Sequence, residues 1–163
     1  MIEFVEGNLL ESGCDVIVHQ VNCQKVMGAG IAKQIRQKWP QVYYEYCDNI
    51  EYCYENGICR SSYDFLGMIN WTEIDNNKYI VNFYSQDEYY PRDRCHTDYR
   101  AFTDCCITLK NFITGYNLDK ANIIIGFPYK IGCGLAGGDW SIVSKIIEEE
   151  LSDYNVKIYK FDR

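Results

Sequence analysis

The chain has 163 residues, 47% of them apolar, and a formal net charge of −7 at pH 7. This length and composition fit one compact domain with a sizeable core, so we expect a single domain over residues 1–163. The acidic balance disfavours broad binding of nucleic acid, because such binding requires a basic surface that neutralises phosphates. A local basic rim at Arg92 and Arg94 remains compatible with that expectation.

The N-terminal segment argues against export, and the arrangement of the cysteines argues against a metal site. The chain opens with "MIEFVEGNLL", which has no basic stretch followed by an apolar run, and no apolar run reaches the length of a membrane span. Nine cysteines are present without a Cys-x-x-Cys pair, together with only two histidines. We therefore expect a cytoplasmic monomer with reduced thiols, no membrane contact, no metal and no cofactor.

Strand-like and helix-like segments alternate along the chain. Short runs rich in Val, Ile, Tyr and Phe predict strands, and apolar residues at helical spacing predict helices between them. This alternation predicts a three-layer α/β/α sandwich with a mixed, mainly parallel sheet of about six strands, in which "NIIIGF" is a central strand. The predicted strands are 2–5, 15–21, 66–74, 78–84, 122–129 and 156–161, and the predicted helices are 31–39, 99–113 and 142–151.

Residues 47–63, "CDNIEYCYENGICRSSY", are the least regular part of the sequence. Their Asn, Gly and Ser content predicts a turn-rich excursion between a helix and the next strand. We assign no chemistry to this segment.

Two glycine-rich segments each follow a predicted strand and open a helix. In the first, "VNCQKVMGAGIA", glycines 28 and 30 permit close approach of a ligand, and the start of the helix favours a phosphate. A tight turn without a ligand explains the first segment equally well. The second, "GCGLAGGDW", has four glycines within residues 132–138, and a loop so poor in side chains suits ligand contact better than packing. Ligands of open α/β sheets bind at the carboxyl ends of strands, so the two loops together predict a diphosphate held between two helix N-termini.

This combination resembles the macrodomain family, and the resemblance covers nearly the whole chain. "VEGNLL" is similar to the family's first strand and adenine-side turn, "DVIVHQVN" to its second strand, and "GAGIAKQI" and "GCGLAGGDW" to its two phosphate loops. The motifs "VNCQKVMGAGIA" and "GCGL" are most similar to the branch that contains terminal ADP-ribose glycohydrolase, the yeast ADP-ribose-1″-phosphate phosphatase and the antitoxin that removes ADP-ribose from DNA.

The resemblance implies a set of ADP-ribose-binding residues. Asn8 and Leu9 would lie beside the adenine, although the family more often has aspartate where Asn8 stands, and Asn22 would approach the distal ribose. The two sides of the diphosphate would be formed by Gly28, Ala29, Gly30 and Ile31 and by Gly132, Cys133, Gly134, Leu135, Ala136 and Gly137.

The resemblance is weaker for catalysis. Hydrolases of this branch are similar to one another in using a lysine after the strand equivalent to "YIVNFY" and an acid in the second loop, but Gln86 and Ala136 stand there. The remaining catalytic candidates are His19, which can act as acid or base near neutral pH, and Asp139. His19 could equally be a satisfied core residue, and Asp139 a helix N-cap.

We therefore expect a protein that binds ADP-ribose, or an ADP-ribosylated macromolecule, and hydrolyses an ADP-ribose derivative. The reaction would remove ADP-ribose from a macromolecule or dephosphorylate ADP-ribose-1″-phosphate. The alternative is a non-catalytic reader of ADP-ribosyl marks, or a module that sequesters a free ADP-ribose-like nucleotide. A third possibility is a macrodomain whose pocket no longer takes ADP-ribose, because fold alone does not fix function.

Overall fold

The structure is a computed structural model that describes residues 2–161. Six strands form one sheet in the order β1-β6-β5-β2-β4-β3. Every neighbouring pair is parallel except β3 and β4, which are antiparallel. The prediction of a mixed, mainly parallel sheet with a central "NIIIGF" strand is thereby confirmed. The strands are β1 (Ile2–Glu6), β2 (Val16–Val21), β3 (Ile69–Asp75), β4 (Lys78–Tyr84), β5 (Ile124–Pro128) and β6 (Asn155–Lys160).

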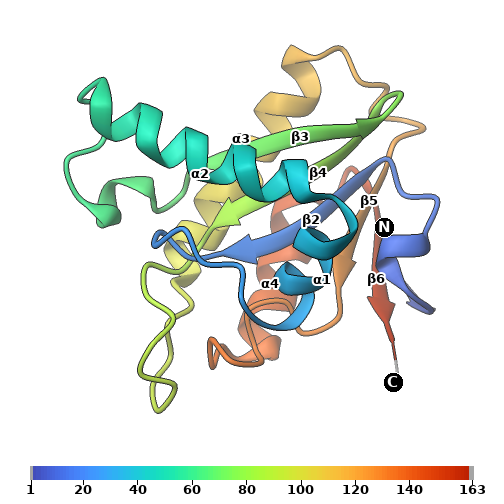
Figure 1. The fold of residues 1–163 in the computed structure, drawn as a ribbon. Coiled ribbons are helices and arrows are strands. Elements are labelled where there is room, and N and C mark those ends of the chain that lie inside the picture. Colours follow the sequence, from blue (N-terminus) through green and yellow to red (C-terminus); the bar gives the residue numbers. More distant parts are fainter. Residues whose placement is uncertain (1, 162–163) are drawn as a thin grey trace.

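Helices cover both faces of the sheet, which confirms the three-layer arrangement (Figure 1). Helices α1 (Gly30–Lys38) and α2 (Pro40–Glu55) pack on one face, and α3 (Tyr99–Gly115) and α4 (Trp140–Glu150) on the other. Strand β2 explains why both faces are buried: Val16 and Val18 join the core under α3 and α4, whereas Ile17 and Val21 join the core under α1 and α2. A strand buried on both sides is mostly apolar, and the two polar residues of β2, His19 and Gln20, form hydrogen bonds inside the fold.

The prediction for residues 47–63 was wrong in its first half. Residues 47–55 belong to α2, a helix of 16 residues whose buried side chains recur at helical spacing. Those side chains are Val42, Tyr46, Ile50 and Cys53. Within residues 47–55 the buried side chains are Ile50 and Cys53, and the many polar and exposed residues around them gave this stretch a turn-like composition. The turn begins only at Asn56 and Gly57, and a short 3-10 helix, Ser62–Phe65, follows.

The carboxyl ends of β2, β4 and β5 lie together at one edge of the sheet, because these three strands are mutually parallel neighbours. The segments that leave these ends are residues 22–29, 85–98 and 129–139. All nine cysteines carry free thiols. Within residues 2–161, no helix combines the length and the apolar character needed to cross a membrane.

Gly126 of β5 tests how tightly the sheet packs on the N-terminal 3-10 helix, Leu9–Glu11. A Cβ at this position would lie 2.6 Å from Leu9 Cδ1 and 2.7 Å from Cys14 Sγ, and both residues are buried. We expect Gly126→Ala to lower the free energy of unfolding by about 1 to 3 kcal/mol, because overpacking forces the core to shift. Urea unfolding measures this. Gly13→Ala is the control, since its Cβ meets nothing within 4 Å; equal stability of the two variants would contradict the packing argument.

Candidate functional site

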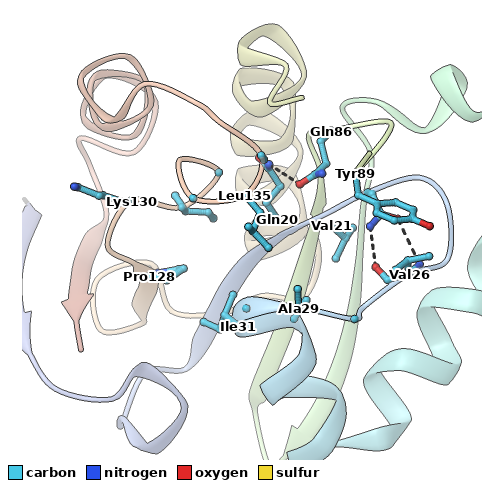
Figure 2. A pocket seen from close by; sticks show the side chains of 18 of the residues that line it. Gln20, Val21, Val26, Ala29, Ile31, Gln86, Tyr89, Pro128, Lys130 and Leu135 are labelled. Atoms are coloured by element: carbon cyan, nitrogen blue, oxygen red, sulfur yellow. Dashed lines mark hydrogen bonds between the residues drawn. The ribbon is translucent and has the colours of Figure 1, made fainter. Parts of the chain in front are cut away.

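A cavity of about 490 Å³ opens at the carboxyl ends of β2, β4 and β5. Figure 2 shows Ala29 and Ile31 of the first glycine segment on one side and Leu135 of the second glycine loop on the other. The sequence-predicted residues that line the cavity are Asn22, Gly28, Ala29, Gly30, Ile31, Gly132, Gly134, Leu135 and Ala136.

The start of α1 is open toward this cavity. Ala29 is the N-cap residue and provides no side-chain hydrogen bond to the first turn. The first N–H groups of a helix have no partner within the helix, and together with the helix dipole they favour an anion. This end of α1 is therefore suited to a phosphate group.

The second glycine loop offers further backbone donors. Turn hydrogen bonds from Gly137 N to Gly134 O (3.0 Å) and from Gly138 N to Gly132 O (2.8 Å) hold the loop in shape. Within the described residues, the N–H groups of Gly134, Leu135 and Ala136 donate no hydrogen bond. Gly132 has φ +73°, and a Cβ there would lie 2.8 Å from Gln20 Oε1, so a glycine is needed for this close approach.

The N-terminus of α4, which follows the second glycine loop, is capped by a side chain of the protein. The prediction that a diphosphate lies between two open helix N-termini was therefore wrong for this helix. Asp139 caps α4: its Oδ1 accepts hydrogen bonds from Ser141 N (2.9 Å) and Ser141 Oγ (2.7 Å). These hydrogen bonds hold the pKa of Asp139 below its usual range. A carboxylate at that helix end occupies the place that an anion would take, so only α1 presents an uncapped N-terminus to the cavity.

Gln20, at the end of β2, ties the cavity walls together. Its Oε1 accepts a hydrogen bond from Ser85 Oγ (2.6 Å), and its Nε2 donates to Gln86 Oε1 (2.9 Å) and Thr97 Oγ1 (3.0 Å). Thr97 Oγ1 in turn donates to Gly132 O at 2.6 Å. One buried amide therefore fixes the ends of β2 and β4 and, through Thr97, the second glycine loop.

Residues 86–97 form a segment that joins the two glycine loops. His96 N donates to Ala136 O (2.7 Å) on one side, and Cys23 N donates to Asp87 O (2.9 Å) on the other. Tyr89 and Arg92 of this segment line the cavity. We call residues 86–97 the bridging segment.

The charge at the cavity is opposite to that of the whole chain. Arg92 and Lys130 line it, and no Asp, Glu or His is among its lining residues within the described part of the chain. Cationic side chains and free N–H groups favour a doubly charged diphosphate. Across residues 2–161, no group of three or more His, Cys, Asp and Glu residues is placed to hold a metal ion.

His19 lies outside the cavity lining. Its side chain is fully buried on the α1–α2 side of the sheet, and its Nε2 forms a hydrogen bond with Asn82 Oδ1 at 2.5 Å. Asn82 Nδ2 donates onward to Asn70 Oδ1 at 3.1 Å, so a polar ladder crosses β2, β4 and β3. Burial lowers the pKa of His19 to about 4, against a smaller opposing effect of the Asn82 hydrogen bond. This position favours a structural role for His19.

The other carboxylates near the strand ends also have structural partners. Asp98 caps α3 by accepting from Ala101 N (2.9 Å), and Asp87 Oδ1 accepts from Gln24 Nε2 (2.9 Å). Together with the capping role of Asp139, these contacts leave no carboxylate of the described residues facing the ligand space.

The remaining predicted residues lie at the margins of the cavity. Asn8 and Leu9 line a neighbouring hollow of about 360 Å³, which shares Ile31, Pro128 and Tyr129 with the main cavity. Cys133 and Gly137 are not among the lining residues. Cys133 Sγ donates to Ile131 O (3.3 Å), and a Cβ on Gly137 would lie 3.2 Å from Arg94 O of the bridging segment.

Comparisons with known proteins agree on the fold. No family model matches the chain. The macrodomain of Thermus aquaticus DarG superposes with a TM-score of 0.73 at 25% identity, covering 100% of this chain and 99% of that one. A Bacteroides thetaiotaomicron protein of unknown function superposes with a TM-score of 0.79 at 25% identity, covering 98% of each chain. Thermosipho africanus DarTG, solved in complex with ADP-ribose, superposes with a TM-score of 0.76 at 18% identity; 98% of this chain and 41% of that chain are covered.

The chain therefore has the macrodomain fold. In sequence it is similar to the DNA ADP-ribosyl glycohydrolase of Mycobacterium tuberculosis, with 26% identity over 166 aligned residues. That alignment covers 98% of this chain but only 42% of the mycobacterial protein. An uncharacterized 17.5 kDa protein of phage T4 is 26% identical over 160 residues, and this alignment covers 98% of this chain and 90% of the phage protein.

Several cavity residues carried no signal in the sequence. Gln20 stood out only as a polar residue near the end of an apolar strand, and Lys130 only as a charge in a loop. Three further lining residues had an expected role: Tyr89 at the distal ribose wall, Arg92 in a local basic rim, and Gln86 at the position of the family's lysine. The lining residues without a predicted role are Gln20, Val21, Val26, Ala32, Pro128, Tyr129, Lys130 and Ile131.

The buried imidazole of His19 makes stability depend on pH. Its pKa is about 4 in the folded protein and about 6.5 in the unfolded chain. Between these values the unfolded chain binds a proton that the folded protein does not, so stability is complete above pH 6.5 and falls as the pH falls. From about pH 7 to about pH 4.5 the loss attributable to His19 is about 2 to 3 kcal/mol.

We expect urea unfolding of His19→Gln to show a smaller drop in stability over that interval than the native protein. Carboxylates titrate in both proteins, so the difference between the two drops isolates the imidazole. Identical pH dependence would contradict the structural assignment of His19.

Proposed function

We propose that the cavity binds an ADP-ribosyl group, with its diphosphate between the start of α1 and the backbone of residues 134–136. One observation carries this proposal: the uncapped α1 N-terminus and the free N–H groups of the second loop line the same cavity. Arg92 and Lys130 add positive charge to that lining. Donors of this kind recognise a diphosphate without a metal ion.

The hollow beside the cavity supports an orientation for the ligand. We propose that the adenine lies in the hollow lined by Asn8 and Leu9, which shares Ile31 with the main cavity. Asn8 Oδ1 already accepts from Leu10 N (3.0 Å), so its Nδ2 is the group left to donate to a ring nitrogen of the base. An amide in this position can therefore replace the aspartate that is commoner in the family.

The distal ribose then lies at the opposite end of the cavity, where Asn22, Gln86 and Tyr89 line it. Asn22 is largely engaged in shaping the first loop: its Oδ1 accepts from Gln24 N (2.9 Å) and Tyr46 Oη (2.9 Å), and its Nδ2 donates to Val26 O (2.8 Å). The orientation places the bond between the ribose and its carrier beside the bridging segment.

Hydrolysis of that bond is the second part of the proposed function. The observation in its favour is the similarity, along 98% of the chain, to proteins named DNA ADP-ribosyl glycohydrolase. In this reaction water adds its oxygen to the anomeric carbon of the distal ribose, the bond to the carrier breaks, and the carrier takes the proton. The alternative, capture without cleavage, is supported by a lining without carboxylate or histidine in the described residues.

Gly134→Val tests the binding site. A Cβ on Gly134 meets nothing within 4 Å, so the variant should fold, while its side chain enters the wall against which the diphosphate is proposed to lie. We expect calorimetric titration to show ADP-ribose binding by the native protein and at least about tenfold weaker binding by Gly134→Val. Gly13→Val, an equally unobstructed site outside the cavity, should bind as the native protein does. No heat from native protein at high ADP-ribose concentration would refute the binding proposal.

Gln86→Lys tests the chemistry. The family hydrolases that this chain resembles use a lysine here, and an amine can attack or stabilise the anomeric carbon where an amide cannot. We expect Gln86→Lys to release ADP-ribose from ADP-ribosylated DNA or protein at least about tenfold faster than the native chain, with unchanged ADP-ribose affinity. Gln86→Met removes the amide without adding an amine and serves as the control.

Turnover of ADP-ribose-1″-phosphate, measured in the same series, separates the phosphatase from the glycohydrolase. Tight binding without turnover of any of these substrates by the native protein would select the reader or sequestering role.

A further inference from the structure

A second groove begins where the main cavity ends. It has a volume of about 400 Å³, lies between α1 and the start of α2, and is lined by Gly28, Lys33, Arg36, Pro40, Tyr43 and Tyr44 among others. We call it the α1–α2 groove. Gly28 lines both this groove and the main cavity, so the two adjoin at this residue.

The position of Gly28 decides which part of a ligand would reach the groove. The proposed adenine hollow adjoins the main cavity at Ile31, Pro128 and Tyr129. In Figure 2 these residues lie on the left, at Pro128 and Ile31, whereas Val26 and Tyr89 lie on the right. A Cβ on Gly28 would lie 3.7 Å from Val26 Cγ1, so Gly28 lies beside Val26 and the groove leaves from the proposed distal-ribose side. The carrier of the ADP-ribosyl group is attached at that side.

The groove is basic in a protein that is acidic overall. Lys33 and Arg36 project from α1, a helix without any acidic residue, and within residues 2–161 neither forms an ion pair with a carboxylate. No Asp or Glu is among the groove's described lining residues. Against a net charge of −7, this local excess of positive charge suits an anionic chain.

Aromatic rings lie beside these charges. The Arg36 guanidinium carbon lies 3.6 Å from the centroid of the Tyr43 ring. The neighbouring Tyr44 is 63% exposed, and its ring centroid lies 6.0 Å from that of Tyr43. Exposed rings between cationic side chains form the stacking platforms on which single-stranded nucleic acids lie, because bases stack on the rings and phosphates meet the cations. An acidic peptide would use the charges but has no planar bases to stack on Tyr44.

Resting on the proposed binding of an ADP-ribosyl group in the main cavity, we propose that the α1–α2 groove holds the single-stranded nucleic acid that carries this group. The net negative charge of the chain disfavours strong attachment of unmodified strands. The groove instead adds affinity to a ligand that the main cavity already holds, since linked contacts act at high effective concentration.

The test compares three probes on the full chain. They are free ADP-ribose, a short single-stranded oligodeoxyribonucleotide carrying one ADP-ribosyl group through a non-hydrolysable carbocyclic ribose, and an acidic peptide carrying the same group. The native protein should bind the modified oligonucleotide at least about tenfold more tightly than free ADP-ribose at low salt, and this advantage should shrink as salt rises. Equal affinity for these two probes would overturn the proposal.

Charge reversal locates the contact. Lys33→Glu combined with Arg36→Glu should remove most of the difference in affinity between the modified oligonucleotide and free ADP-ribose. Binding of the oligonucleotide should also depend less on salt, while free ADP-ribose binds as before. Tyr44→Ala should weaken binding of the modified oligonucleotide about fivefold or more, because a base loses its stacking partner. The matched control is Lys120→Glu with Lys145→Glu, which makes the same change in net charge at exposed sites outside the groove.

Two results would overturn recognition of nucleic acid by this surface. One is an equal loss of oligonucleotide affinity in the control variant. The other is an equal loss of affinity for the ADP-ribosylated acidic peptide when the charges of the groove are reversed. Failure of native protein to bind free ADP-ribose would refute the function proposed for the main cavity, whereas intact ADP-ribose binding without any oligonucleotide advantage would refute only the role of the groove.

Discussion

The side chain of Gln20 is the contact on which the cavity depends. Ser85, Gln86 and Thr97 all converge on this one buried amide, and Thr97 passes the connection to the carbonyl of Gly132. A buried amide with satisfied hydrogen bonds is rigid because each bond that is lost leaves a polar group without water. The network therefore holds the second glycine loop against the ends of β2 and β4, although glycine itself stabilises loops poorly.

Positive charge gathers at the cavity and the groove, although the chain as a whole is acidic. The chain carries a net charge of −7, yet Arg92 and Lys130 line the cavity and Lys33 and Arg36 line the α1–α2 groove. The carboxylates nearest the strand ends are used as helix caps or loop contacts and lie outside the cavity lining. An anionic ligand is thus met by cations and backbone donors, while the acidic remainder of the surface disfavours nonspecific attachment of nucleic acid.

Helix α1 has two separate surfaces for a ligand in this arrangement. Its uncapped N-terminus lies at the main cavity, where the first N–H groups favour a phosphate, and its outer face supplies the cations of the adjoining groove. A ligand that carries an ADP-ribosyl group on a nucleic-acid strand would contact both surfaces, which adjoin at Gly28. This shared residue links the function proposed for the cavity to the carrier proposed for the groove.

The sequence by itself determined the layers of the fold and the two loops, because strand and helix periodicity and clustered glycines are local properties. It misjudged residues 47–55, where Ile50 and Cys53 continue the buried stripe of α2, and it could not identify Gln20, whose partners are 65 to 77 residues distant in the chain. Only the tertiary structure decided that His19 faces the α1–α2 core, since a single strand does not reveal which side of the sheet will face the ligand. It likewise decided that Asp139 closes the α4 N-terminus while α1 stays open, because a cap is defined by the hydrogen bonds that the folded backbone brings within reach.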